Sequence, residues 1–179
     1  MSRQIMSDTQ STLIKKDANS GRKNLVFVRG GNTSMHYALY PLPDNRTWDL
    51  CLSAYEELRT SDLEKADIVL RGGVSKWTTF YELFFLGEQI LSKYERIMVI
   101  DDDVVFERKT DIDLCFKIAS ERELLICQPS LDHQSHHSFK ITLNNPSMLI
   151  RYTNFVECMV PILSSCAIHK LKDCIKSNV

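Results

Sequence analysis

Three consecutive carboxylates, at residues 101–103, directly follow an apolar run at residues 97–100. Such a run predicts a buried strand of a parallel sheet, whose C-terminal end faces the crevice where α/β proteins bind ligands. If the backbone stays extended, Asp101 and Asp103 share one face about 6–7 Å apart, and Asp102 points away. Two carboxylates at that separation repel by roughly 3 kcal/mol at an effective dielectric constant of about 20, a cost that a hard cation removes. Because Mg²⁺ and Mn²⁺ are commonly held by one or two carboxylates and substrate phosphates, we predict metal-assisted binding of a phosphorylated substrate.

Two basic residues could help to bind the phosphates. Lys76 is expected in the first turn of a helix, shortly after a Gly-Gly pair, and Arg29 is followed by a second Gly-Gly pair. Backbone amides at helix N-termini and in glycine-rich turns attract phosphate, and a lysine adds a full positive charge. The chain has neither a G-x-G-x-x-G sequence nor a P-loop lysine motif, so the dinucleotide-binding and P-loop classes are excluded.

One carboxylate lies within a segment that is otherwise expected to be buried. Glu157 interrupts an otherwise apolar segment at residues 155–163. Burying an unpaired carboxylate is costly, so its side chain either reaches a functional site or pairs with a cation such as Arg151.

Alternating apolar segments predict the elements that position these side chains. We expect strands at residues 25–28, 48–55, 67–70, 97–100, 124–127 and 141–143. Apolar residues at helical spacing predict a long helix that begins at its N-cap Ser75 and ends at about residue 93. Shorter helices are expected at residues 114–120 and from residue 164 onward. The alternation of strands and helices predicts an α/β domain with a mainly parallel sheet flanked by helices.

Composition narrows the class of protein. The chain has 179 residues and a formal net charge of −1, which gives no drive toward nucleic acid or anionic membranes. No apolar stretch is long enough to span a membrane. Residues 1–23 are expected to form a flexible polar leader, ahead of one domain at residues 24–179. The six cysteines include no C-x-x-C pair, which favours reduced thiols in a cytoplasmic protein.

Several short motifs between residues 24 and 170 occur together in one known family. They are N-L-V-F-V-R at residues 24–29, W-D-L at 48–50, the Asp triplet, Q-P-S-L at 128–131 and N-F-V-E-C-M-V-P at 154–161. On these segments the chain resembles a bacterial and plant family of domains of unknown function. The core of that family is similar to the GT-A glycosyltransferases, which use nucleotide-diphosphate sugars.

The resemblance implies a GT-A-like, Rossmann-like fold and a DXD-type role for the triplet. Asp101 would contact the sugar nucleotide, and Asp103 together with Asp101 would hold Mn²⁺ or Mg²⁺ on the diphosphate. Glu157 would lie on the acceptor side, where it is the candidate catalytic base. The acceptor itself is an unknown hydroxyl compound, such as a glycan. The expected substrate-binding residues are Asp101, Lys76, Arg29 and Gln128.

Two alternatives to a transferase remain. Family members continue past the last helix with a Gly-Trp-Gly-Leu-Asp-like segment, so this chain is expected to be truncated at its C-terminus, and a non-catalytic remnant or binding domain is one alternative. The other is a haloacid-dehalogenase-type phosphatase, in which Asp101 would be phosphorylated and Asp103 would act as acid and base. Its further metal-binding acids would have to come from Asp111, Asp113 or Asp132.

Overall fold

Four apolar segments form parallel strands at the centre of the molecule. The computed structural model describes residues 11–18, 21–40, 42–108 and 110–177. The central strands are β2 (Asn24–Gly30), β3 (Trp48–Ala54), β4 (Ile68–Arg71) and β5 (Arg96–Ile100). Their apolar side chains are buried on both faces of the sheet, which is typical of parallel strands covered by helices.

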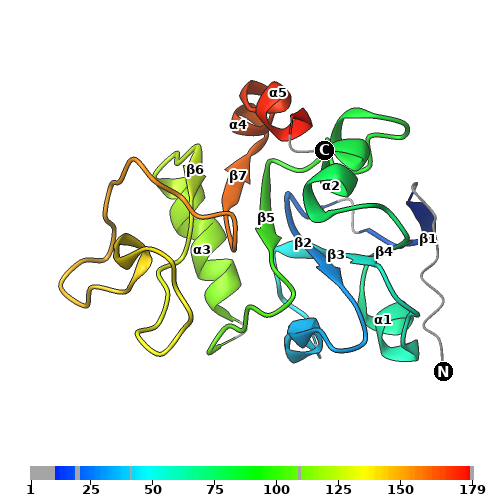
Figure 1. Ribbon diagram of the computed structural model, residues 1–179, viewed down its shortest axis with the longest axis horizontal. Coiled ribbons are helices and arrows are strands. Elements are labelled where there is room, and N and C mark those ends of the chain that lie inside the picture. The colour runs from blue at the N-terminus through cyan, green and yellow to red at the C-terminus, as the bar shows by residue number, and fades with distance from the viewer. Residues whose placement is uncertain (1–10, 19–20, 41, 109, 178–179) are drawn as a thin grey trace.

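Three further strands extend the sheet at its two edges. They are β1 (Thr12–Lys16), β6 (Ile126–Cys127) and β7 (Ile162–Ser164). The strand order is β1-β4-β3-β2-β5-β7-β6 (Figure 1). Strand β1 is antiparallel to β4, and β7 is antiparallel to both β5 and β6. The predicted α/β domain with a mainly parallel sheet is therefore confirmed.

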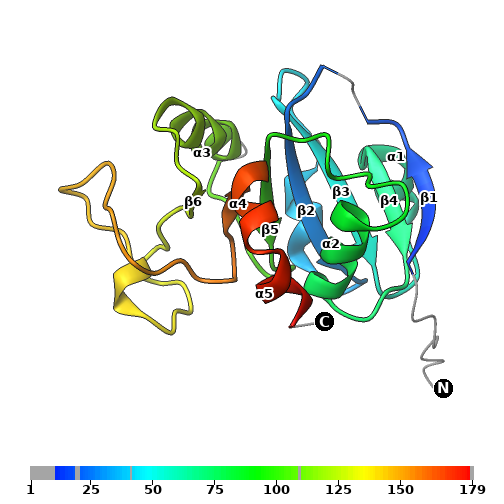
Figure 2. The ribbon, with the colours of Figure 1, turned by 90° about the horizontal axis from the view of Figure 1, so that it is seen from above.

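Helices cover both faces of this sheet (Figure 2). One face packs against α2 (Lys76–Phe85), α4 (Ser165–Lys170) and α5 (Lys172–Lys176). The other packs against α1 (Thr60–Lys65), α3 (Thr110–Glu121) and the 3₁₀ helix η1 (Met35–Leu39). Alternate residues of each central strand enter the two cores, so that Phe27 and Val99 lie on the α2 face and Val28 and Ile100 on the α3 face. No helix within the described ranges is long and apolar enough to cross a membrane.

The order of the strands reverses at β2. The chain runs outward from β2 through β3 to β4 and then returns to form β5 on the opposite side of β2, where Val28 lies opposite Ile100. In open α/β sheets, ligands bind in the crevice beyond the C-terminal strand ends at such a switch point. The triplet at residues 101–103 follows β5 and therefore lies at this position.

The leader predicted at residues 1–23 is wrong in its second half. Thr12–Lys16 forms β1 at the edge of the sheet, so the folded domain begins before residue 24. An edge strand buries only part of its surface, and here the sequence Thr-Leu-Ile-Lys-Lys gives a weak apolar pattern. Residues 1–10 and 19–20 of the predicted leader lie outside the described residues.

Two other elements differ from their predicted form. Helix α2 ends at Phe85 rather than near residue 93, because Gly87 and Gln89 adopt positive φ angles and turn the chain. The strand predicted at residues 141–143 is instead the 3₁₀ helix η2 (Lys140–Thr142), followed by a single bridge between Leu143 and Leu131. A segment of three residues, only two of them apolar, was too short to distinguish a strand from one helical turn.

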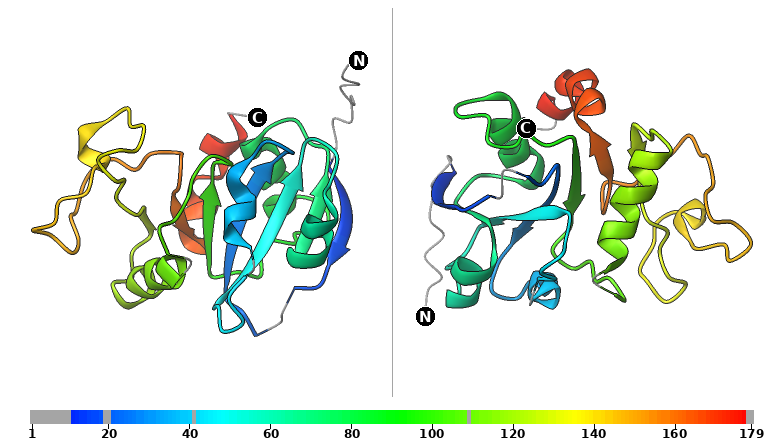
Figure 3. Two further views of the ribbon diagram at one scale, coloured as in Figure 1. Left: turned by 90° about the horizontal axis from the view of Figure 1, so that it is seen from below. Right: turned by 180° about the vertical axis from the view of Figure 1, so that it is seen from behind.

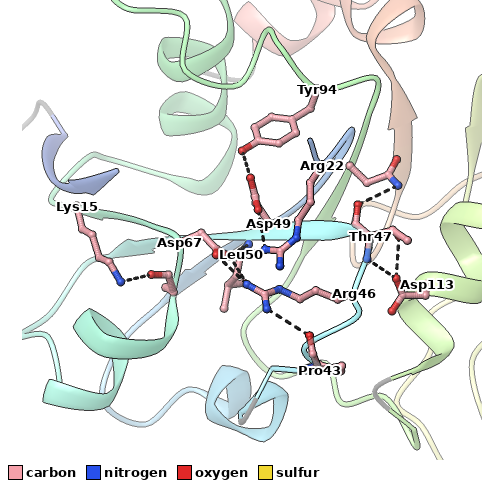
Figure 4. Close-up of polar contacts among 12 residues, drawn as sticks. Lys15, Arg22, Pro43, Arg46, Thr47, Asp49, Leu50, Asp67, Tyr94 and Asp113 are labelled. Carbon is pink, nitrogen blue, oxygen red and sulfur yellow. Dashed lines mark hydrogen bonds and ion pairs between the residues drawn. The ribbon is translucent and has the colours of Figure 1, made fainter. Parts of the chain in front are cut away.

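A buried network of charges closes the opposite, N-terminal edge of the parallel strands (Figure 4). Asp49 is completely buried and accepts hydrogen bonds from Arg22, at 2.9 Å, and from the Tyr94 hydroxyl, at 2.7 Å. Asp67 accepts two hydrogen bonds from Arg46, at 2.7 and 2.9 Å. These residues lie at or just before the first residues of β2, β3, β4 and β5, so the network fixes the spacing of the strands where they begin.

We expect Asp49→Asn to lower the free energy of unfolding by about 3–5 kcal/mol, because it leaves the largely buried Arg22 guanidinium without its closest carboxylate. Urea denaturation followed by circular dichroism measures the loss. The control is Asp17→Asn, which removes an exposed carboxylate that pairs with the half-buried Lys15, and it should cost about 0.5 kcal/mol or less. Equal losses in the two variants would contradict a stabilising role for the network.

Candidate functional site

The Asp triplet forms a turn directly after β5. The Asp101 carbonyl accepts a hydrogen bond from the Val104 amide at 3.2 Å, and residues 102 and 103 lie in the turn. The extended backbone predicted for the triplet is therefore wrong, since the chain leaves the sheet at Ile100. In the turn the three carboxylates contact different neighbours.

Asp101 and Lys76, both predicted to bind the substrate, form an ion pair. The Lys76 ammonium also donates to the Cys158 carbonyl at 2.8 Å, and the Asp101 amide donates to the Met159 carbonyl at 2.8 Å. Lys76 occupies the first turn of α2, where the Ser75 hydroxyl caps the helix by accepting from the Thr78 amide. The N-terminus of α2, the end of β5 and the segment before β7 therefore meet at this ion pair.

Asp102 was expected to point away from the site, but its carboxylate joins three strand ends. It accepts hydrogen bonds from the Ser34 hydroxyl and, at 2.8 Å, from the Tyr55 hydroxyl. Its main-chain carbonyl accepts from the Met35 amide at 2.6 Å. Ser34 follows β2 and Tyr55 follows β3, so Asp102 links the ends of β2, β3 and β5. The sequence did offer one indication of this contact. Ser34 and Tyr55 each follow a predicted strand, and residues that follow neighbouring parallel strands lie at the same edge of the sheet.

Asp103 is the exposed carboxylate of the triplet. Its side chain accepts no hydrogen bond from any residue that the structure describes, and it lines a cavity of about 1110 Å³. Gln128, which was also predicted as a substrate contact, lines the same cavity. The cavity lies between the segment after β5, helix α3 and residues 128–160.

Glu157 lies beside this site with an unsatisfied oxygen. Its amide donates to the Gln128 side-chain oxygen at 2.5 Å, while its Oε2 atom is buried and finds no hydrogen-bond partner within the described ranges. The alternative pairing with Arg151 is not formed, because Arg151 donates to the carbonyls of Ile141 and Leu143. A buried carboxylate oxygen without a hydrogen-bond partner is costly for stability, which makes Glu157 a candidate functional residue.

Arg29 organises the start of α2. Its guanidinium donates to the carbonyls of Gly72, at 2.8 Å, and Gly73, at 2.5 Å. Both glycines have positive φ angles, and a Cβ atom at Gly73 would collide with the Thr79 side chain. Burial lowers the pKa of Arg29. The terminal nitrogens of Arg29 thus shape the turn that leads to Lys76, whereas the sequence predicted a direct contact with substrate.

The acids that a phosphatase would need are engaged elsewhere. Asp111 pairs with Arg108 at 3.0 Å, and Asp113 accepts hydrogen bonds from the amide and hydroxyl of Thr47, both at 2.7 Å. Asp132 accepts from the Gln134 amide in its own loop. Throughout the part of the chain that the structure describes, no group of three or more histidine, cysteine or acidic residues is placed to hold a metal ion.

Comparisons with known proteins find a weak likeness among solved structures. No protein-family model matches the sequence, and no curated protein matches it. Among solved structures, 4-diphosphocytidyl-2C-methyl-D-erythritol synthase from Anaerococcus prevotii is similar at a TM-score of 0.48 and 10% identity. The match covers 88% of this chain and 76% of that chain. At this TM-score and identity, the likeness carries no argument about activity.

The contact between Tyr55 and Asp102 makes a prediction about ionisation. The pKa of Tyr55 is raised, mainly by burial and further by the Asp102 carboxylate, while the Ser34 hydroxyl opposes the shift. A carboxylate favours the neutral phenol, so Asp102→Asn should lower the pKa of Tyr55. NMR titration of ¹³Cζ-labelled tyrosine measures it. Asp103→Asn is the matched control and should leave the pKa of Tyr55 where it is; a similar fall in both variants would contradict the contact.

Proposed function

We propose that this protein binds a nucleotide-diphosphate sugar at the C-terminal end of β5 and transfers the sugar to a hydroxyl acceptor. The observation that carries the proposal is the ion pair of Asp101 and Lys76 next to the exposed Asp103, at the switch point of the sheet. A full positive charge at a helix N-terminus suits a diphosphate. The resemblance found in the sequence independently points to the same class of substrate.

In this proposal Asp103 would hold a divalent cation that the substrate also contacts, and Asp101 would join it by exchanging its contact with Lys76 for the cation. Asp103 is exposed without a hydrogen-bond donor among the described residues, and the Asp101 side chain is 40% exposed. Mg²⁺ and Mn²⁺ are commonly bound by one or two carboxylates, with phosphate oxygens and water completing the shell. When bound, such a cation supplies charge neutralisation for the departing nucleoside diphosphate.

The remaining residues have separate tasks in this proposal. Lys76 binds the diphosphate, and Arg29 holds the turn that places Lys76. The bond between the anomeric carbon and the diphosphate oxygen breaks, a bond to the acceptor oxygen forms, and the hydroxyl proton passes to the Glu157 carboxylate. The unpaired Oε2 atom of Glu157 and its contact with Gln128 support that last role. Gln128 then positions Glu157 and lines the acceptor side.

The proposal places this activity in the cytoplasm. Cys51, Cys115 and Cys127 are buried or half-buried thiols rather than disulfides, which is typical of proteins from reducing compartments. Burial raises the pKa of Cys115 and Cys127, to about 12 and about 11, so these two thiols are not nucleophiles in the proposed reaction.

Binding of UDP- and GDP-sugars should depend on Mn²⁺ and on Asp103. We expect Asp103→Ala to weaken metal-dependent binding of the preferred sugar nucleotide by more than about tenfold, because one of two protein ligands is lost. Isothermal titration calorimetry with and without Mn²⁺ measures it. The matched control is Asp44→Ala, which removes an exposed carboxylate outside the site. Binding that is indifferent to Mn²⁺ and to Asp103 would sink the proposal.

Glu157→Gln should separate binding from turnover. The substitution keeps the shape of the side chain and removes the base, so the affinity for the sugar nucleotide should stay the same. Acceptor-dependent release of nucleoside diphosphate should fall by about a hundredfold or more. A coupled assay of diphosphate release with the full chain measures it. Unchanged turnover would exclude Glu157 as the base while leaving the substrate class in place.

A further inference from the structure

The cavity beside Asp103 is larger than a single substrate group requires. Its volume is about 1110 Å³, above the range of roughly 300–1,000 Å³ that is common for small-molecule sites. Many of its lining residues belong to the segment at residues 128–160. That segment extends beyond α3 on the side of the molecule farthest from β1 (Figure 3). Asp103 and Gln128 line this cavity, whereas Asp101 and Lys76 do not, so Asp103 and Gln128 connect the cavity to the proposed sugar-nucleotide site.

Large apolar side chains line this cavity and remain exposed to solvent. Leu149 and Tyr152 are 82% and 78% exposed. Others of the same kind are Val105, Leu114, Ile126 and Met148. They come from the segment after β5, from α3, from β6 and from residues 128–160, so the fold gathers them from separate parts of the chain. An exposed apolar surface of this extent marks a binding groove more often than an idle surface.

The charges around the cavity do not suit an anionic occupant. The carboxylates among its lining residues are Asp103, Glu107, Asp111 and Asp132. Two arginines also line it, but Arg108 pairs with Asp111, and Arg151 donates to main-chain carbonyls. A second phosphate group or a nucleic acid would therefore meet net negative charge. The lining instead suits an uncharged, largely apolar molecule.

We infer that the cavity binds the acceptor, and that this acceptor is an uncharged hydroxyl compound with an extended alkyl or aryl body. The inference rests on the proposed function, since it takes the sugar to be transferred at Asp103. The apolar body occupies the space between α3 and the segment that includes Met148 and Leu149. The hydroxyl group lies at the Asp103 end. Burial of the exposed apolar side chains by the acceptor supplies most of the binding free energy.

The neutral fluorophore N-phenyl-1-naphthylamine tests the cavity without nucleotide or metal. It should bind the chain of residues 1–179 at one site, with n-octanol as a competitor. Leu149→Asp and Val105→Asp should each weaken its binding by more than about tenfold, because they place a charge where the apolar body lies. The matched control is Leu63→Asp, which introduces the same charge at an exposed leucine on α1 and should leave binding unchanged. Equal binding by all variants would overturn the inference.

Two further outcomes separate this inference from the proposed function. If sugar nucleotides bind with Mn²⁺ but Leu149→Asp has no effect on the fluorophore, the function stands and the acceptor class is overturned. If the fluorophore binding depends on Leu149 but no sugar nucleotide binds, the proposed function fails, and with it the acceptor role. Sedimentation velocity tests whether a second copy of the chain covers the cavity instead. A dimer that Leu149→Asp dissociates would show this and would overturn the inference.

Discussion

Strand β2 pairs with β3 on one side and with β5 on the other, although β5 comes two strands later in the chain. The loops that follow β2 and β5 must therefore leave the sheet in different directions, and a crevice opens between them. Asp102 spans this opening through Ser34 and Tyr55. The position of the Asp triplet depends on this reversal, because it brings the carboxylates after β5 next to the glycine turn after β2.

The two ends of the parallel strands differ in how their carboxylates are paired. At the N-terminal edge, Asp49 and Asp67 are deeply placed and their partners satisfy them, which is the usual condition for buried charges. At the C-terminal edge, Asp103 is exposed without a donor among the described residues, and the Glu157 Oε2 atom is buried without one. One buried side-chain nitrogen in each of His36, Arg46 and Arg96 also lacks a partner among the described residues, but Glu157 Oε2 is the carboxylate oxygen in that group.

The sequence was sufficient to predict those elements whose structure follows from a local pattern of residues. Runs of large apolar residues predicted β2 to β5, and Ser75 predicted the start of α2, because burial and capping are local properties of a segment. Prediction from the sequence failed where contacts with distant residues determine the position of a side chain. Side chains alternate between the two faces only as far as Ile100, where the strand ends, so the prediction for Asp102 was wrong. The sequence also could not show that the Arg29 guanidinium donates to the carbonyls of Gly72 and Gly73. The cavity could not be predicted either, since its lining comes from separate segments between residues 103 and 162.

The turn after β5 gives three adjacent residues three different tasks. An extended chain would have placed Asp101 and Asp103 on the same face; the turn instead directs Asp101 to Lys76 on α2 and leaves Asp103 at the cavity. Asp102 holds the turn to the ends of β2 and β3. In the proposed function, donor and acceptor therefore meet across a short segment with little freedom to move. Such fixed placement is what a transfer reaction needs, because a misplacement of about 1 Å between reacting groups can cost a hundredfold in rate.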